Sequence, residues 1–482
     1  MARRAAAGLL RRLVPLAASD TQPRRGMYPA QYGATNRYFS IFYWIQGQQH
    51  PLYGCRTNVE TDDSQQSAQM NFKVQKRSFS SSAAHIQRNP TYSVLNSDDV
   101  SYFKSILGES GVVQDEDRVA VANVDWMGKY KGASQLLLLP KSSNEVSKIL
   151  SYCNSRRLAV VPQGGNTGLV GGSVPVYDEV NGILTCEAGC VLENLSSFVE
   201  NKGFIMPLDL GAKGSCHIGG NISTNAGGLR FIRYGSLHGN VLGLEVVLAD
   251  GTVLDMLTTL RKDNTGYDLK HLFIGSEGSL GVVTKIAILT PAKLPSTNVA
   301  FLSCNDYISC QKLLLAARRS LGEILSAFEF MDRHCINLAM KYLEGVHNPL
   351  PVSPYNFYVL IETTGSDESY DKVYQKHPSK LGLSTSDMGD VLGYGHLGDG
   401  NLHLNIVSTK YSDEMLAQIE PFVYEWTSKQ RGSISAEHGL GLMKAEKIHY
   451  SKSSEAVQLM ASIKKLFDPN SILNPYKVRR YV

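Results

Sequence analysis

The hydrophobic pattern of residues 134–162 predicts two strands joined by a helix. "SQLLLLP" and "LAVVP" are short apolar runs, each closed by a proline. In the intervening "SSNEVSKILSYCNSRR", Val146, Ile149 and Cys153 recur at helical spacing and share one face with Leu150. The main folded region is therefore expected to begin with a strand, a helix and a strand.

Three glycine-rich tracts near predicted strands indicate a large cofactor that carries phosphate. They are "QGGNTGLVGGS" at 163–173, the long tract at 211–236, and "GSEGSLG" at 275–281. Glycine allows positive φ, so backbone N–H groups in such loops can converge on an anion. One such tract alone is explained equally well as a tight connection without a ligand, but three in one region favour a ligand. Asp250-Gly251, between two apolar runs, predicts a hairpin turn.

Several other classes of protein are disfavoured. Neither G-x-G-x-x-G nor G-x-x-x-x-G-K-[ST] follows a strand, which argues against nicotinamide enzymes and P-loop enzymes. No run approaches the roughly 18 apolar residues of a membrane span, and no basic patch indicates nucleic-acid binding. The eight cysteines include no C-x-x-C pair and fit no zinc-finger spacing, so reduced thiols are expected.

The N-terminal stretch "MARRAAAGLLRRLVPLAAS" predicts a mitochondrial transit peptide. It contains four arginines and no acidic residue, and a helical wheel separates the arginines from Leu9, Leu10 and Leu13. Such a basic amphipathic helix is typical of import to the mitochondrial matrix rather than of secretion. "KRSFSSSAAH", with Arg77 ahead of a serine run, resembles a processing site, which predicts a mature start near Ser80. A basic tail without a targeting role is the alternative.

Six motifs together identify a family that the chain resembles. "PQGGNTGLVGG", "STNAGGLRFIRYGSLHG", "GSEGSLGVVTK", "GYGHLGDGNLHLN", "SAEHGLG" and "ILNPYK" occur in this order between about Tyr92 and Lys477. The set is similar to the FAD-dependent 2-hydroxyacid dehydrogenases of the vanillyl-alcohol oxidase superfamily. "NVDWMGKYKG" and "FVYEWTSKQRGSISAEHGLG" most resemble the mitochondrial members that act on D-2-hydroxyglutarate, in particular those of plants.

The resemblance implies an α+β fold: a two-subdomain FAD-binding domain of the PCMH type, a cap with an antiparallel sheet plus helices, and a C-terminal helical segment. The expected boundaries are a transit peptide and disordered leader at 1–79, the FAD-binding domain at 80–295, the substrate or cap domain at 296–440, and a segment at 441–482 that returns to the flavin site. In such a fold the first glycine tract binds the FAD pyrophosphate and the second runs along the flavin. The cofactor-binding residues implied are Pro162, Gly164, Gly165, Asn166, Thr167, Gly168, Gly219, Gly220, Asn221, Thr224, Asn225, Gly227, Gly281, Val282 and Asn474.

The motif "GYGHLGDGNLHLNI" predicts a metal site. His396 and His403 are an odd number of residues apart, so one continuous strand would point them to opposite faces. A chain reversal at Gly398–Gly400 brings both imidazoles together from neighbouring strands, and Glu437 of "SAEHGLG" supplies a carboxylate. Two imidazoles and one carboxylate form a three-ligand site with an open position, which suits Zn²⁺.

The same resemblance assigns roles to these residues. His396, His403 and Glu437 are implied as metal ligands, His438 as the catalytic base, and Asn405 as a substrate contact together with His396 and His438. Asp399 is better interpreted as a turn residue than as a ligand. Taken singly, each histidine is more often a structural residue, but the combination favours the metal site.

Two segments of the family pattern are shorter in this chain. Relatives have a longer stretch where this chain has only 365–390, and that stretch carries an Arg, a Thr and a Lys that hold the substrate carboxylates. Relatives also insert an apolar strand between Val180 and Asn181, and its loss is expected to upset strand pairing. Four functions therefore stay open: oxidation of D-2-hydroxyglutarate with electrons passed to an electron-transfer flavoprotein, oxidation of D-lactate or glycolate, a catalytically impaired flavoprotein, and a metal hydrolase without flavin. A homodimer is implied only by the family.

Overall fold

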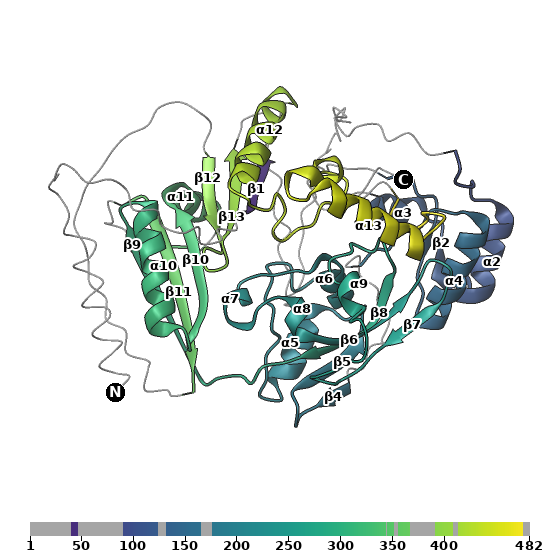
Figure 1. The fold of residues 1–482 in the computed structure, drawn as a ribbon, viewed down its shortest axis with the longest axis horizontal. Helices are drawn as coiled ribbons and strands as arrows, with labels where there is room; N and C mark the ends of the chain where they lie inside the picture. Colours follow the sequence, from purple (N-terminus) through teal and green to yellow (C-terminus); the bar gives the residue numbers. More distant parts are fainter. Residues whose placement is uncertain are drawn as a thin grey trace, which may run out of the picture.

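The computed structural model describes residues 40–46, 90–123, 132–164, 176–343, 345–350, 355–366, 391–407 and 413–475. These residues form two lobes, each built around its own sheet (Figure 1). The first lobe contains a five-stranded sheet whose strands lie between residues 176 and 289. The second, called the cap lobe, contains a six-stranded sheet whose strands lie between residues 296 and 407, joined by one strand at 40–46. Among the described helices, none combines the length and the apolar character that a membrane crossing requires.

The first lobe begins with a small layer around helix α4 (Ser143–Arg156). The predicted helix is confirmed: Ser142 caps its N-terminus, Arg157 ends it in a left-handed conformation, and its apolar face is buried. The prediction of a second strand at 158–162 is wrong, because Val160 forms only an isolated bridge, with Leu473 of the C-terminal segment. The accompanying elements are α2 (Ser97–Leu107), η1 (Glu109–Gly111), β2 (Val112–Val113), α3 (Glu116–Ala122) and β3 (Leu137–Leu138).

The five-stranded sheet of the first lobe has the order β4-β5-β8-β6-β7 and is antiparallel throughout. Its core joins Leu184, Leu244 and Ile286 of the sheet to Leu192 and Ile222 of two covering helices. This burial of apolar area is the main contribution to the stability of the lobe. The strands are β4 (Val176–Asp178), β5 (Ile183–Glu187), β6 (Val241–Val247), β7 (Val253–Met256) and β8 (Val282–Leu289), and the helices are α5 (Leu192–Glu200), α6 (Ile218–Thr224), α7 (Phe231–Tyr234), α8 (Leu237–Asn240) and α9 (Lys270–Phe273).

Two turns of this sheet test the sequence analysis. The predicted hairpin at Asp250-Gly251 is confirmed, because β6 and β7 pair antiparallel and Gly251 has φ +91°. The expected upset of strand pairing around Val180 and Asn181 is wrong for the described residues. β4 and β5 pair across a short turn there, and β5 pairs with β8 along its length. Val180, 94% exposed, is left as an uncovered apolar side chain in that turn.

The six-stranded sheet of the cap lobe has the order β1-β13-β12-β10-β11-β9. Its pairs are antiparallel except for β1 with β13. Helix α10 packs on one face, where Cys310 and Ala317 meet Phe328 and Val359 of the sheet. The elements are β9 (Ser296–Cys304), α10 (Tyr307–Leu321), β10 (Leu325–Asp332), α11 (Arg333–Tyr342), β11 (Phe357–Gly365), β12 (Val391–Gly395) and β13 (Asn401–Val407).

Strand β1 (Ser40–Gln46) is the only described segment of the leader expected at 1–79. It pairs in parallel with β13, with Phe42 opposite His403. The prediction of a disordered leader is therefore wrong for these residues. The physical reason is that β13 would otherwise be an edge strand, whose unpaired backbone groups form a template for another strand.

The C-terminal elements run from the cap lobe back to the first lobe (Figure 1). They are α12 (Asp413–Lys429), η3 (Ala445–Tyr450) and α13 (Ser454–Phe467). Phe467 packs edge-on against Phe273 with ring centroids 5.6 Å apart. Lys464 Nζ donates to the carbonyls of Ser279 and Leu473 at 2.6 and 2.9 Å. These contacts bring Asn474 beside the glycine loop at 275–281.

Candidate metal and cofactor site

The hairpin β12–β13 places the two histidines of the glycine-rich motif. His396 follows β12 directly and His403 lies within β13, opposite Tyr394. Asp399 Oδ1 accepts the backbone N–H of Asn401 at 3.0 Å, which confirms the prediction that Asp399 is a turn residue. A glycine is required at 395, because φ is +149° and a Cβ would lie 2.6 Å from the carbonyl oxygen of Asn401.

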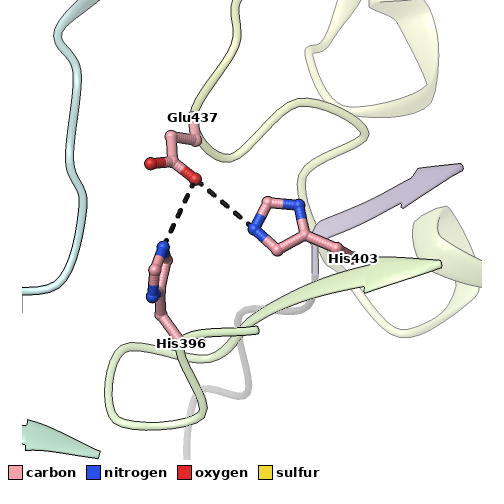
Figure 2. Close-up of side chains that lie close together, drawn as sticks. All are labelled: His396, His403 and Glu437. Atoms are coloured by element: carbon pink, nitrogen blue, oxygen red, sulfur yellow. Dashed lines mark ion pairs between the residues drawn. The ribbon is translucent and has the colours of Figure 1, made fainter. Parts of the chain in front are cut away.

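Glu437 joins the two histidines, so the structure brings together the three predicted metal ligands (Figure 2). Glu437 Oε2 lies 3.8 Å from His396 Nε2 and 3.7 Å from His403 Nε2. One candidate ligand atom from each residue lies within 4.8 Å of the other two. With Zn–N and Zn–O bonds of about 2.0–2.2 Å, a tetrahedral ion fits between such atoms after small side-chain adjustments. The donor set of two imidazoles and one carboxylate also suits Zn²⁺.

Two further residues orient these ligands. Glu329 Oε2 lies 2.7 Å from His396 Nδ1, and both side chains are largely buried. Asn401 Nδ2 donates to Glu437 Oε2 at 2.8 Å. Carboxylate partners on the second nitrogen of a metal-binding histidine are common, since they fix the tautomer and the ring orientation. Glu329 was not predicted from the sequence, although a glutamate in the apolar strand "SAFEFMD" is a signal for a buried charge with a specific role.

His438 and Asn405, two of the predicted substrate contacts, lie near the cluster. His438 Nε2 is 4.0 Å from Glu437 Oε2, and its side chain is 51% exposed, far more than that of His396 or His403. Asn405 Nδ2 donates to Tyr394 Oη at 3.3 Å, and the Tyr394 ring stacks on His403. His438 therefore adjoins Glu437 with an accessible side chain, and Asn405 is linked to His403 through Tyr394.

The two histidines of the cluster differ in their affinity for protons. Burial is the largest single effect on His396 and opposes its charged form. The hydrogen bond with Glu329, together with the negative charges of Glu329, Glu437 and Asp399, outweighs burial and raises the His396 pKa to about 9. Burial lowers the pKa of His403 to about 4. Burial also lowers the pKa of His438.

A second group of predicted residues meets around the loop at 275–281. A Cβ added at Gly278 would lie 3.5 Å from Asn474 Nδ2 and 3.6 Å from Pro162 Cγ. The side-chain oxygens of Asn225 and Asn474 are buried and have no hydrogen-bond partner among the described residues. Buried amide oxygens are normally paired, so two orphaned acceptors here indicate a polar ligand. The donors of an FAD fit this requirement.

The second glycine tract connects this region with the metal cluster. A Cβ at Gly227 would lie 4.0 Å from Glu437 Oε1 and 3.6 Å from the Phe231 ring. The neighbouring Gly228 has φ +87°, and a Cβ there would lie 2.2 Å from the carbonyl oxygen of Asp209. The tract expected to run along a flavin therefore reaches a predicted metal ligand.

The remaining predicted cofactor residues have structural roles of their own where they are described. In α6, Gly219 packs closely on Ala188, and the Thr224 hydroxyl donates to the carbonyl of Gly220. Gly281 packs against Val246, while Val282 contributes to a hydrophobic cluster of the first lobe. Asn221 is buried in α6, Gly164 lies beside His217, and Gly165, Asn166, Thr167 and Gly168 lie outside the described residues.

Two families match the sequence of the chain. The one described as "FAD binding domain" matches residues 134–257. The one described as "FAD linked oxidases, C-terminal domain" matches residues 293–377 and 376–478. The second match is thus split at 376–377, inside the stretch 365–390 that the sequence analysis found shortened.

Curated relatives cover nearly the whole chain. A protein of Oryza sativa subsp. japonica named "Probable D-2-hydroxyglutarate dehydrogenase, mitochondrial" is 78% identical over 553 residues, which covers 99% of this chain and 99% of the rice protein. An Arabidopsis thaliana protein named "D-2-hydroxyglutarate dehydrogenase, mitochondrial" is 60% identical over 84% of this chain and 86% of its own length. The aligned length with the rice protein exceeds the 482 residues of this chain, so that protein contains residues with no counterpart here.

A solved structure of alkyldihydroxyacetonephosphate synthase has a related fold. It superposes with a TM-score of 0.51 and 14% identity, over 80% of this chain and 86% of that chain. At that identity the likeness concerns the fold alone. Together with the FAD-binding match, it confirms the predicted α+β architecture.

Proposed function

Because the chain belongs to the family of FAD-linked oxidases that includes the mitochondrial D-2-hydroxyglutarate dehydrogenases, we propose that it oxidises D-2-hydroxyglutarate to 2-oxoglutarate with FAD as electron acceptor. One observation carries this proposal: the glycine tract expected along the flavin lies against Glu437 of the His-His-Glu cluster. An oxidation that needs both an electron acceptor and a polarised hydroxyl requires such adjacency.

His396, His403 and Glu437 would hold the metal ion, and Glu329 keeps the His396 ring in orientation. A bound Zn²⁺ supplies a Lewis acid that lowers the pKa of the substrate hydroxyl, and a bound FAD accepts the two electrons from C2. Pro162, Asn225 and Asn474 surround the expected flavin position. The orphaned amide oxygens of Asn225 and Asn474 are available to accept hydrogen bonds there.

His438 is assigned as the group that accepts the proton of the substrate hydroxyl. Its imidazole adjoins Glu437, is half exposed, and can therefore reach a molecule on the open side of the cluster. A neutral imidazole acts as a base, whereas His396 and His403 direct one nitrogen each to the cluster. Asn405, beside Tyr394 on the same strand as His403, would donate its amide N–H to a substrate oxygen.

The setting of the reaction follows from the relatives and from the leader. We assign the protein to the mitochondrion because its relatives are named as mitochondrial, and to the matrix because of the basic amphipathic start. An electron-transfer flavoprotein is the proposed acceptor of the electrons from reduced flavin. A homodimer is proposed from the family resemblance alone.

The distal carboxylate of the substrate needs a cation close to the site. Three described arginines near the junction of the lobes are each engaged with backbone carbonyls: Arg230 with Met206, Arg233 with Thr364, and Arg318 with Gly398. Lys372, Lys376 and Lys380, from the shortened stretch, lie outside the described residues. A desolvated carboxylate without a partner costs several kcal/mol, so this chain is expected to bind the diacid weakly and oxidise it slowly.

The shortage of cations for a distal carboxylate favours a second candidate function. This function is the oxidation of a monocarboxylic 2-hydroxy acid such as D-lactate or glycolate. Stopped-flow reduction of bound flavin by D-2-hydroxyglutarate and by D-lactate distinguishes the two. The control is a chain in which both shortened segments are restored. Faster reduction by D-lactate in this chain, with the order reversed in the restored chain, supports the role of the missing clamp. Equal, rapid reduction by D-2-hydroxyglutarate in both proteins would show that the clamp is dispensable.

A flavin and metal assay of the purified protein tests the underlying chemistry. Denaturation should release FAD, and metal analysis should find about one zinc per chain. A folded sample with neither would rule out the proposed oxidation. Metal without yellow colour would favour the metal hydrolase considered in the sequence analysis.

A further inference from the structure

The carboxylate of Glu277, in the glycine loop at 275–281, holds the loop that follows the metal ligand Glu437. Its Oε1 accepts the backbone N–H of Leu440 at 2.6 Å, and its Oε2 accepts that of Gly441 at 2.8 Å. Gly439 and Gly441 have φ +79° and +51°. Successive N–H groups in such conformations form an anion-binding concavity, and here the anion is a side chain of the same protein.

This contact leaves no room for a side chain between the two loops. A Cβ at Gly439 would lie 2.5 Å from Glu277 Oε1 and 2.7 Å from its Cδ. The Ser435 hydroxyl also donates to the carbonyl of Gly439. The stretch that includes Glu437 and His438 is thus fixed from both sides, with the Glu277 carboxylate as its link to the first lobe.

The backbone of Glu277 is tied to two segments that belong to the expected flavin site. Its N–H donates to the carbonyl of Ser223 in α6 at 2.7 Å, and its carbonyl accepts from Asn474 Nδ2 at 2.5 Å. The residue itself has φ +53°, an unusual conformation for a non-glycine residue. Glu277 is therefore a junction of α6, the C-terminal segment and the loop of the metal cluster.

We propose that Glu277 is a positioning residue that couples flavin binding to metal binding. The inference rests on the proposed function, since it takes the region of Asn225 and Asn474 as the flavin site and the His-His-Glu cluster as the metal site. A ligand that orders the loop at 275–281 orders the Leu440–Gly441 loop through the Glu277 carboxylate. By linkage, FAD and Zn²⁺ then raise each other's affinity by the same factor.

The test compares Glu277→Gln with Glu200→Gln, a matched control on the surface of the first lobe, where Glu200 pairs with Lys293. Glutamine offers one acceptor oxygen and turns an NH₂ group toward the second backbone N–H. Zinc affinity is measured by competition with a chromophoric chelator, on the full chain with and without bound FAD. This readout needs no substrate and no turnover.

Wild type and Glu200→Gln should bind zinc roughly 10-fold more tightly with FAD than without it. In Glu277→Gln the FAD effect should vanish and affinity should fall by roughly 10- to 100-fold.

Hydrogen exchange gives a second measurement on the same proteins. The amides of Leu440 and Gly441 should be protected in wild type and exchange faster in Glu277→Gln, while the core strands β6 and β8 keep their protection. If Glu277→Gln does not fold, Glu277→Asp keeps the charge with a shorter reach and should show a smaller loss of the FAD effect. In steady-state assays Glu277→Gln should lower kcat more than it raises KM, because the loop that follows Glu437 carries His438.

Equal zinc affinity in Glu277→Gln and wild type, with the FAD effect intact, would overturn the coupling. So would an FAD effect lost equally in Glu200→Gln. These outcomes are distinct from a failure of the proposed function, in which wild type binds FAD and zinc but its flavin is not reduced by a 2-hydroxy acid. Absence of zinc binding in wild type would end both proposals.

Discussion

Replacing Glu329 by glutamine should weaken metal binding without disturbing the fold. Glu329 accepts a hydrogen bond from His396 at 2.7 Å, and the two side chains are only 15% and 17% exposed. A hydrogen bond to a charged group contributes about 1.5–3 kcal/mol, which corresponds to roughly a 10- to 150-fold change in affinity. Glutamine still accepts the Nδ1–H but lacks the charge, so the loss should lie between about 10- and 100-fold, the range found for such supporting residues.

Titration of the metal-free protein with Zn²⁺ against a chromophoric chelator measures this loss. Glu362→Gln is the matched control, because Glu362 belongs to the neighbouring strand β11 and pairs with Ser326 rather than with a metal ligand. FAD content and melting temperature should stay close to wild type in both variants. Wild-type zinc affinity in Glu329→Gln would refute the argument that the carboxylate supports His396 as a ligand.

Three further predictions concern the base and two buried charges. His438→Asn should slow flavin reduction by roughly 10²–10⁴-fold in stopped-flow assays while FAD is retained, and an unchanged rate would remove the assignment. Asp99 is buried, and its hydrogen bond from Arg156 outweighs burial and lowers the Asp99 pKa to about 2. In urea unfolding at pH 7, the free energy of unfolding of Asp99→Asn should therefore be about 1–3 kcal/mol lower than that of wild type. This difference should persist above the ordinary pKa of 3.8 and close as pH falls through about 2. A difference independent of pH would contradict the ion pair. Burial lowers the pKa of Lys444 from 10.5 to about 8, so the unfolded state binds more protons between these values. The free energy of unfolding of wild type relative to Lys444→Met should consequently rise from about pH 8 to 10.5 by up to about 3 kcal/mol, and a flat difference would show that Lys444 titrates normally.

The His-His-Glu cluster was predictable because its signal is local. The glycines around Asp399 specify a reversal, and the odd spacing of His396 and His403 makes sense only if the chain turns between them. Glu437 became a candidate through its motif rather than through any spacing rule. The sequence thus predicted that His396, His403 and Glu437 meet, while the approach of the second glycine tract to Glu437 at Gly227 became visible only in the fold.

The residues that support the cluster were not predictable from local pattern. Glu329 precedes His396 by 67 residues, and the two meet because β10 pairs with β12 at Phe330 and Gly395. Glu277 and Leu440 are 163 residues apart. Pairings over such separations depend on the packing of whole elements, which single-sequence periodicity does not encode. The failed strand at "LAVVP" has the same origin, since the main-chain partner of Val160 is the distant C-terminal segment.

The parallel strand β1 also affects how the protein should be produced. A recombinant chain begun near Ser80 lacks residues 40–46, so β13 becomes the outer strand of the cap sheet. Its open backbone then invites strand addition between molecules. A sample that retains residues 40–46 should stay monodisperse at higher concentration than one trimmed at the expected processing site.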